Sequence, residues 1–209
     1  MADKIISPYC FSTAEKKVIK DSFKNHSDWD KSCFDDIKSA LKEDLRPKQT
    51  NSCCYCKREL GFDIKEVDIE HIVPKSKYEK FTFHPKNLAL SCPGCNTNKS
   101  NQPVLHKEIK IYPRSGINLT IVHPYFDCYS EHIEIHDGAI YEGLSSKGCE
   151  TIKLCKLYRL KKVLEKKKEA KSKSSPIAQL VSDLANASDA EKQQIVAALG
   201  LHTNQFRGN

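Results

Sequence analysis

Two stretches near the start of the chain have the spacing of amphipathic helices. Ser12 and Glu15 form a capping-box pattern, in which a hydroxyl and a later carboxylate bond backbone amides, so a helix should follow to about Phe23. Further on, apolar residues recur every three or four positions, as on one face of a second helix: Phe34, Ile37, Leu41 and Leu45. This helix should end at Arg46-Pro47, because the residue before a proline avoids the helical region.

Between residues 50 and 100 the helical periodicity disappears, and short apolar runs stand among cysteine, glycine and proline. Residues 67–73 alternate with a period of two, which predicts a strand that displays Asp68 and Glu70 on one face. Pro74 should end this strand, because proline cannot donate a ladder hydrogen bond. Residues 87–90 predict a second short strand.

Three further elements are predicted after the second strand. A short polar helix should carry Asn96 and Lys99. Residues 132–141 indicate a β-hairpin with Asp137-Gly138 as a two-residue turn. From about residue 150 to residue 170, apolar positions recur with helical spacing and lysines fill the remaining positions, which predicts one long helix.

These patterns divide the chain into three predicted parts. An N-terminal helical segment covers residues 1–48, a core with the hairpin and the long helix covers 49–173, and a C-terminal helical hairpin covers 174–209. In the last part, one short helix is expected over residues 177–184. A second is expected around residues 195–199, with Ser188 and Glu191 as its capping pair and Gly200 after its end.

Charge and hydropathy describe a basic protein without a membrane segment. The net charge is +7, and no apolar run approaches the ~20 residues that a membrane helix needs. The first residues, Met1-Ala2-Asp3-Lys4, lack the apolar stretch of a signal peptide. The sequence therefore predicts a soluble, cytoplasmic protein that contacts no membrane, and its charge is compatible with a polyanionic partner.

Much of the positive charge lies between residues 156 and 173. Glu165 and Glu169 are the acidic residues of this segment, and the basic ones are Lys156, Arg159, Lys161, Lys162, Lys166, Lys167, Lys168, Lys171 and Lys173. Two interpretations remain open. This helix face is simply solvated, or it binds nucleic-acid phosphates with Lys161, Lys162 and Lys166 as the candidate contacts.

Ten cysteines are many for a chain expected in a reducing compartment, where clustered cysteines usually bind metal. Four of them form two C-x-x-C pairs, Cys53 with Cys56 and Cys92 with Cys95. Two such pairs supply four thiolates, which suit a structural, tetrahedral zinc site with no open position for catalysis. The alternative is four unrelated buried cysteines, which does not explain the repeated spacing. Cys54, inside the first pair, is expected to point away from the metal.

Polar residues stand in a specific order in the insert between the two cysteine pairs and directly after the second pair. These are Glu70 and His71 on the predicted strand, an I-x-P-x-S motif after them, Asn87-Leu88 later, and then Asn96 and Lys99 after the second pair. In this order the chain resembles an HNH (ββα-metal) endonuclease over residues 53–100. The spacing from Asn87 to Asn96, Lys99 and Ser100 also resembles that in the HNH domains of CRISPR effector nucleases, which lack these cysteines.

The resemblance implies an α+β fold: a ββα-metal core clamped by a four-cysteine zinc site, with N-terminal helices and a C-terminal helical extension. It also implies roles for individual residues. His71 would be the general base, and Asn87 would brace the loop between the strands. Glu70 and Asn96 would hold one catalytic divalent cation, with Asp68 as a weaker candidate. Asn96 stands where many family members have a second histidine, which leaves the metal open between Mg²⁺ and Mn²⁺.

Phosphodiester hydrolysis requires the chemistry that these residue types supply. A histidine, with an ordinary pKa of about 6.5, can accept a proton from water near neutral pH. A carboxylate and an amide oxygen suit a hard divalent cation, which neutralises charge on the phosphate. Lys99 is a candidate contact to a non-scissile phosphate. In-line attack on this pattern would leave 5′-phosphate and 3′-hydroxyl ends.

A weaker resemblance extends beyond residue 100. His123-Pro124-Tyr125-Phe126-Asp127, Glu131-His132-Ile133, Gly138-Ala139-Ile140 and Glu150-Thr151-Ile152-Lys153-Leu154 follow in an order similar to that of HNH effectors from Septu-type and retron-associated anti-phage systems. Such effectors work beside an ATPase of the ABC/SMC kind. The resemblance therefore implies a partner ATPase, with the helices after residue 150 as candidate docking surfaces.

Three classes of function follow from the sequence. The first is a metal-dependent HNH endonuclease, with DNA as the favoured substrate and RNA as the alternative. The second is a zinc-stabilised nucleic-acid-binding module without catalysis, and the third is a subunit that docks on a partner. Glu70, His71 and Asn96 favour the first class, because a binding module needs none of them.

Overall fold

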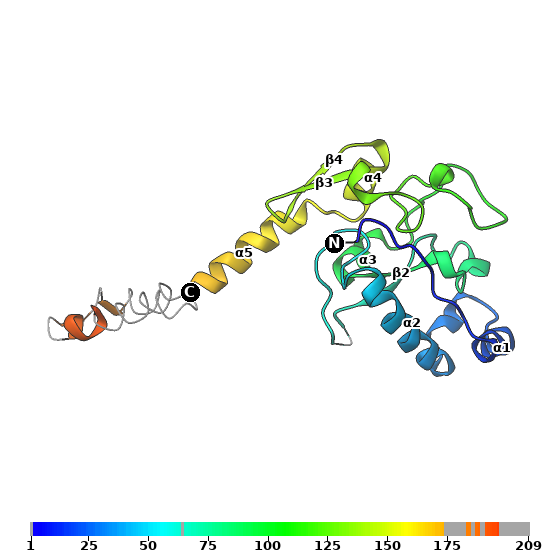
Figure 1. The fold of residues 1–209 in the computed structure, drawn as a ribbon, viewed down its shortest axis with the longest axis horizontal. Helices are drawn as coiled ribbons and strands as arrows, with labels where there is room; N and C mark the ends of the chain where they lie inside the picture. Colours follow the sequence, from blue (N-terminus) through cyan, green and yellow to red (C-terminus); the bar gives the residue numbers. More distant parts are fainter. Residues whose placement is uncertain (1, 64, 174–182, 185–186, 189–190, 197–209) are drawn as a thin grey trace. The chain divides into compact units, whose positions relative to one another are not determined.

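The structure is a computed structural model that describes residues 2–63, 65–173, 183–184, 187–188 and 191–196. The chain packs as two units, Met1–Tyr158 and Arg159–Asn209. The first unit carries most of the helices and all of the strands that are described, and Figure 1 labels several of them, including α1 to α4 and β2 to β4. The predicted domain boundaries after residues 48 and 173 remain predictions.

The capping box at the start of the first predicted helix is confirmed. Helix α1 spans Thr13–Ser22, and the Ser12 hydroxyl accepts a hydrogen bond from the Glu15 amide at 3.2 Å. In return, the Glu15 carboxylate accepts from the Ser12 amide at 2.7 Å. The helix therefore begins where two of its free amides find local acceptors.

Helix α2 spans Asp35–Lys48 and buries the predicted apolar face, including Leu41 and Leu45. The prediction that it ends at Arg46-Pro47 is wrong, because Pro47 lies within its last turn. The Gln49 side chain donates to the Leu90 carbonyl at 2.9 Å and accepts from the Leu90 amide at 2.7 Å. This pair of bonds to a distant strand holds the end of the helix and offsets the bond that proline cannot make.

The centre of the first unit is a ββα arrangement. Strand β1, Asp68–His71, pairs antiparallel with β2, Leu88–Ser91, in a register that places Glu70 opposite Ala89. Helix α3, Pro93–Lys99, packs against β1, and α2 packs against β2 (Figure 1). Both strands form where the sequence predicts them, although β1 is shorter than predicted and β2 begins one residue later.

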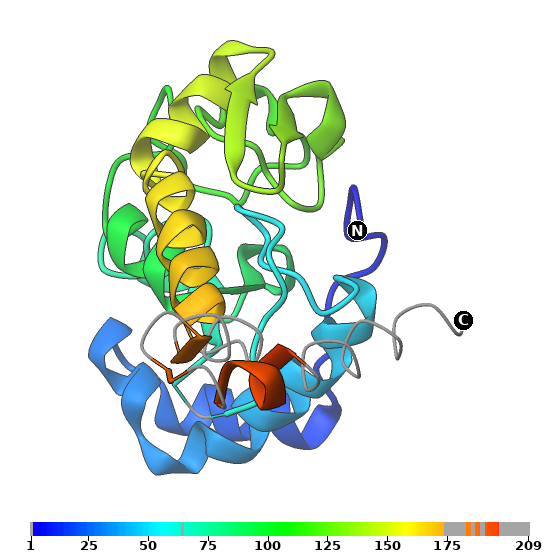
Figure 2. The same ribbon diagram turned by 90° about the vertical axis from the view of Figure 1, so that its left-hand side faces the viewer.

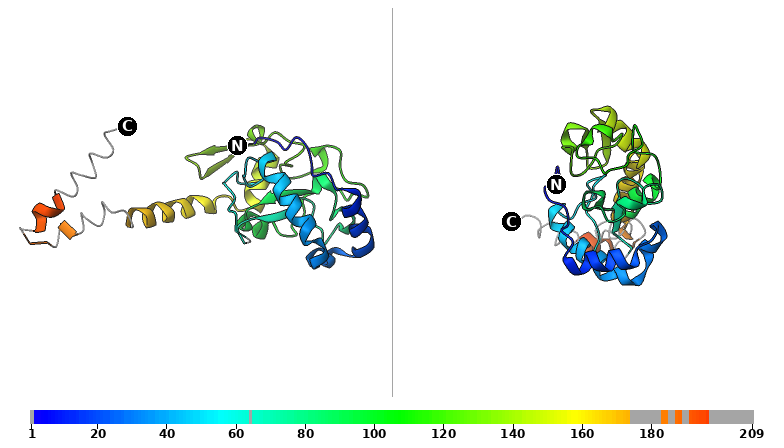
Figure 3. Two further views of the ribbon diagram at one scale, coloured as in Figure 1. Left: turned by 60° about the horizontal axis from the view of Figure 1, so that its bottom comes forward. Right: turned by 90° about the vertical axis from the view of Figure 1, so that its right-hand side faces the viewer.

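A second sheet and a short helix lie at the opposite end of this unit from α1 and α2, as the views in Figure 2 and Figure 3 show. Strands β3, Ile133–His136, and β4, Ile140–Gly143, form the predicted hairpin. Asp137 and Gly138 both have positive φ, which an Asp-Gly turn favours. The connection holds three residues rather than two, because the register pairs His136 with Ile140 and leaves Ala139 in the loop.

The prediction of one long helix after residue 150 is wrong. Helix α4 spans Ser146–Leu154, and helix α5 spans Arg159–Lys173. Between them, Lys156 adopts a φ of 47°, and the Leu157 amide donates to the Ile152 carbonyl at 2.9 Å. These are the features of a Schellman C-cap, which ends a helix at a left-handed residue. The break itself contains two buried apolar residues, Cys155 and Leu157. For this reason the apolar pattern of the sequence shows no interruption between the two helices.

The remaining short elements are 3₁₀ helices. They span His26–Asp30, Ser32–Phe34, Glu79–Phe81, Pro85–Asn87, Gly116–Asn118 and Tyr129–Glu131. Among the described residues, no helix is long and apolar enough to cross a membrane.

The predicted tail helices are described in part. Residues 191–196 are helical, and the Ser188 amide donates to the Glu191 carboxylate at 2.9 Å, so this predicted capping pair is confirmed. The end of that helix at Gly200, and most of the helix predicted over residues 177–184, lie outside the described residues.

Candidate active site and metal centre

The four predicted metal-binding cysteines meet in one cluster. The sulfur atoms of Cys53, Cys56, Cys92 and Cys95 all lie within 4.8 Å of one another. The sulfurs of Cys56 and Cys92 are 3.8 Å apart, which is about the separation that four 2.3 Å bonds around a tetrahedral ion require. Cys54 is not part of the cluster, and its amide instead donates to the Leu90 carbonyl at 2.9 Å. The donor set therefore fits a closed, structural zinc site.

This cluster joins the turn after α2 to the start of α3. The first cysteine pair lies on the turn after α2, whereas the second pair lies at the start of α3. A bound ion would therefore hold α3 in place beside β1 and β2. The side chains carried by α3, Asn96 and Lys99, would be positioned by the same bond set.

His71 is buried and oriented by a backbone carbonyl. Its Nε2 lies 3.1 Å from the Thr82 carbonyl oxygen, and its ring meets Trp29 edge-on at a centroid distance of 4.6 Å. A carbonyl only accepts, so Nε2 carries the proton and Nδ1 keeps its lone pair. Burial, together with the Lys75 and Lys99 charges, lowers the pKa of His71 to about 3. The imidazole is therefore neutral near pH 7, as a general base must be.

Glu70 takes part in a buried network with two residues from other elements. Its Oε1 atom accepts an ion-pair contact from Lys99 Nζ at 2.6 Å and a hydrogen bond from the Tyr55 hydroxyl at 3.0 Å. Burial raises the pKa of Glu70, and the Lys99 charge opposes that rise. Both contacts are made by Oε1, and neither of them involves the second carboxylate oxygen, Oε2.

Lys99 lies on the predicted helix, α3, but its side chain is buried. Its side chain is 1% exposed, and besides the ion pair its ammonium donates to the His71 carbonyl at 2.9 Å. This placement does not support the predicted contact with a phosphate, because a buried and already paired ammonium cannot reach a bound strand. Lys99 instead links α3 to both predicted active-site residues of β1.

Three of the predicted site residues line one cavity of about 220 Å³. Glu70, His71 and Asn96 share it with Pro74, Lys75, Ser76, Ser100 and Asn101. The Asn96 amide group donates to Asp68 at 2.9 Å, which leaves its carbonyl oxygen outside that bond. A carboxylate oxygen and an amide oxygen beside a neutral histidine fit a hard divalent cation such as Mg²⁺.

Asn87 has the contacts of a brace. This fully buried residue accepts from the Val73 amide at 2.7 Å, and its side-chain amide donates to the carbonyls of Val73 and Phe81 at 3.0 and 2.9 Å. These bonds tie the chain directly after β1 to the segment that ends in Thr82. Since the Thr82 carbonyl orients His71, Asn87 supports the position of His71 through this loop.

The structure adds residues that the sequence analysis does not single out as functional. Trp29 packs on His71, Tyr55 bonds Glu70, and the Tyr112 hydroxyl lies 3.2 Å from the Asn87 side-chain oxygen. Tyr55 had one usable signal, because it lies between two metal-binding cysteines. Trp29 and Tyr112 had none, since their partners are far away along the chain.

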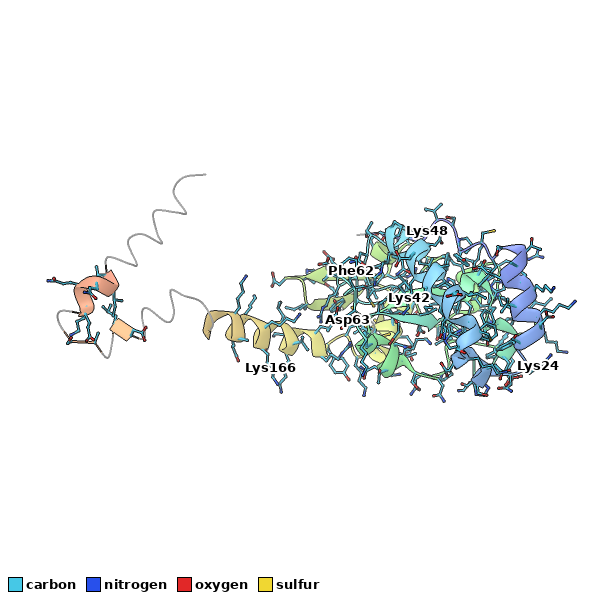
Figure 4. All side chains as sticks on the ribbon, turned by 90° about the horizontal axis from the view of Figure 1, so that it is seen from below. Lys24, Lys42, Lys48, Phe62, Asp63 and Lys166 are labelled. Carbon is cyan, nitrogen blue, oxygen red and sulfur yellow. The ribbon has the colours of Figure 1, made fainter. Side chains whose placement is uncertain are left out.

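One further histidine of the first unit, His84, is not part of this arrangement. His84 stacks on Tyr112 at 4.0 Å and does not line the cavity of His71. Lys161, Lys162 and Lys166 are exposed on α5, and Figure 4 shows the labelled Lys166 side chain projecting from that helix. These lysines belong to the second unit, Arg159–Asn209.

Comparison with known proteins agrees with this geometry. Residues 53–102 match the family model described as HNH endonuclease. The chain is also similar to a Septu protein, PtuB, from Bacillus thuringiensis, with 28% identity over 159 residues. That match covers 76% of this chain and 54% of the relative, so the chain spans about half the length of the curated protein it matches. No solved structure matches the chain significantly.

The matched segment holds the four clustered cysteines together with Glu70, His71 and Asn96. It begins at the first cysteine of the metal cluster, includes β1, β2 and α3, and ends just after Lys99. Residues 53–102 therefore form an HNH endonuclease domain with a four-cysteine cluster, in a chain that is similar to a Septu protein.

Proposed function

We propose that this protein is a metal-dependent endonuclease that hydrolyses phosphodiester bonds of nucleic acid, with DNA as the favoured substrate. The observation that carries the proposal is the shared cavity of Glu70, His71 and Asn96. It places a neutral histidine beside two hard oxygen donors, and hydrolysis of a phosphodiester at neutral pH needs both.

His71 would accept the proton of the attacking water at Nδ1, while the Thr82 carbonyl holds its Nε2–H. Glu70 and Asn96 would hold the catalytic cation, with Asp68 orienting the Asn96 amide. A bound Mg²⁺ or Mn²⁺ would neutralise charge on the phosphate and on the leaving oxygen. Tyr55 and Lys99, which both contact Oε1 of Glu70, would keep this carboxylate in position.

The direct experiment is a cleavage assay with the purified full chain. Plasmid DNA, single-stranded DNA and total RNA are incubated with Mg²⁺, with Mn²⁺ and with no added cation. Cleavage that requires the cation and leaves 5′-phosphate ends supports the proposal, and the substrate that is cut fastest identifies the natural class. Binding to nucleic acid without cleavage of any substrate would support the non-catalytic module instead.

The buried ion pair allows a sharper test of the Glu70 assignment. Glu70→Gln should lose most cation-dependent cleavage and also lower the free energy of unfolding by about 3–5 kcal/mol, because it leaves the Lys99 ammonium buried without its carboxylate. The double variant Glu70→Gln/Lys99→Met should recover most of that stability and none of the cleavage. Thermal denaturation and Mg²⁺ titration of cleavage separate the two effects. Wild-type cleavage by the double variant would remove Glu70 from the cation site.

We also propose that the protein acts as the nuclease effector of an anti-phage system beside a partner ATPase. The similarity to a Septu protein over 76% of the chain supports this assignment. In cells that carry the complete system, the His71→Ala variant should no longer protect against phage. This loss of protection would support the assignment.

The basic face of α5 leads to a separate prediction. If it binds phosphates, replacing Lys161, Lys162, Lys166 and Lys167 with glutamine should flatten the dependence of DNA affinity on salt. Each lost phosphate contact removes about 0.9 from the slope of log K against log salt on duplex DNA. Fluorescence anisotropy over a range of salt concentrations measures this slope. An unchanged slope would assign this face to solvent or to a partner protein.

A further inference from the structure

A second, larger cleft lies outside the candidate active site and carries an excess of positive charge. It encloses about 710 Å³ between the segment of residues 80–86 and the segment of residues 110–114. Its lining contains four cationic side chains and no carboxylate: Lys80, Lys86, Lys110 and Arg114 are joined by Pro8, Phe81, His84, Pro85, Ile111, Tyr112 and Pro113. We call it the basic cleft.

The positive charge of the basic cleft is not neutralised from within the fold. Within the described part of the chain, none of its four cations forms an ion pair with a carboxylate. Lys80 donates to the Lys110 carbonyl, and the Lys86 ammonium lies 5.2 Å from the centre of the Phe126 ring. Neither contact cancels a charge, so like charges gather here without a counter-ion. Such a surface attracts a polyanion.

Two smaller hollows share lining residues with the active-site cavity and with the basic cleft. Pro74 lines both the cavity of His71 and a hollow of about 280 Å³, whose lining also includes Lys77 and Tyr78. Those two residues line a third hollow of about 440 Å³, which reaches Lys110. Lys110 in turn lines the basic cleft. Each hollow thus shares lining residues with the next, from the cavity of His71 to the basic cleft.

The wall of the basic cleft is also coupled to the active site by hydrogen bonds. The buried Tyr112 hydroxyl lies 3.2 Å from the side-chain oxygen of Asn87 and 2.9 Å from Nε2 of His123. Asn87 holds the loop whose Thr82 carbonyl orients His71. The cleft therefore keeps a defined position relative to the base, as a substrate subsite must.

We propose that the basic cleft binds the phosphate backbone of the nucleic acid at positions away from the scissile bond, and that the substrate strand passes over the adjoining hollows from the cleft to His71. The proposal rests on the proposed nuclease function. An acidic protein segment would also be attracted by the charge. The shared linings favour nucleic acid, because the series of hollows that includes the cleft ends at the cavity where a phosphodiester would be cut.

The first test measures DNA binding by the full chain without added Mg²⁺ or Mn²⁺. Lys80, Lys86, Lys110 and Arg114 are replaced together with glutamine. The matched control removes four exposed lysines of the N-terminal helix region: Lys16, Lys17, Lys20 and Lys24, the last of which is labelled in Figure 4. The cleft variant should reduce the salt slope by about 0.9 for each lost phosphate contact, and by about 3 to 4 in all, whereas the control should keep the wild-type slope.

A second measurement does not depend on removing charge. A photo-crosslinking amino acid is placed at Ile111, which is 79% exposed on the cleft, or at Val18 on α1 as the control. Crosslinks to DNA should form from position 111 and not from position 18, and they should map to one side of the cleavage position.

The outcomes separate this inference from the proposed function. A cleft variant with an unchanged salt slope, or a slope loss equal to that of the control, overturns the inference even when the wild-type protein cuts DNA. Binding of an acidic partner in the cleft would give this result. A cleft-specific slope loss in a chain that cuts no substrate would instead uphold the cleft and overturn the nuclease.

Discussion

Replacing His71 with alanine should lower the rate of nucleic-acid cleavage by at least about 10²–10⁴-fold. The imidazole is held by the Thr82 carbonyl and by Trp29, so its Nδ1 lone pair is available in one fixed direction. Alanine removes the base and also the group that positions the attacking water, which adds a further loss. Single-turnover cleavage of plasmid DNA in Mg²⁺ measures the chemical step directly.

The same substitution should have little effect on folding, zinc content and DNA binding. His71 makes one neutral hydrogen bond and one aromatic contact, so its loss should cost only about 1–3 kcal/mol of stability. Zinc content and DNA affinity should stay near the wild-type values. His136→Ala is the matched control, because His136 lies on the hairpin strand β3, outside the lining of the His71 cavity. Cleavage by His71→Ala at the wild-type rate would transfer the base to another residue.

The second large effect is expected at the cysteine cluster. Metal analysis should find about one tightly held zinc per chain, and Cys92→Ser should lose it. A structural zinc site contributes an apparent ~10–16 kcal/mol of binding free energy in small domains, so the core around it should unfold without the ion. Hydrogen exchange should increase in β2 and α3 first, because the cluster joins α3 to the turn after α2. Cleavage should be lost as a consequence.

The chain contains its own control for this prediction. Cys128 is half-buried and lies outside the four-cysteine cluster, so Cys128→Ser should retain the zinc, the thermal stability and the cleavage rate. Folded wild-type protein without zinc would show that the four thiols merely pack together. Full activity of Cys92→Ser would show that the cluster does not support the site.

The sequence alone determines the features that depend on near neighbours. The capping pair at α1 and the two C-x-x-C pairs each act over a few residues, so their pattern specifies their geometry. The order of these features also places His71, Glu70 and Asn96 in one domain. That they line one cavity follows from the antiparallel register of β1 and β2 with α3 behind them.

Only the tertiary structure decides the features that depend on distant partners. The end of α2 depends on Gln49 meeting Leu90, and the role of Lys99 depends on Glu70, which lies on another element. In each case the free energy of a buried polar group is set by whichever partner the fold brings within bonding distance. The basic cleft has the same origin, since its cations come from two chain segments that become neighbours only after folding.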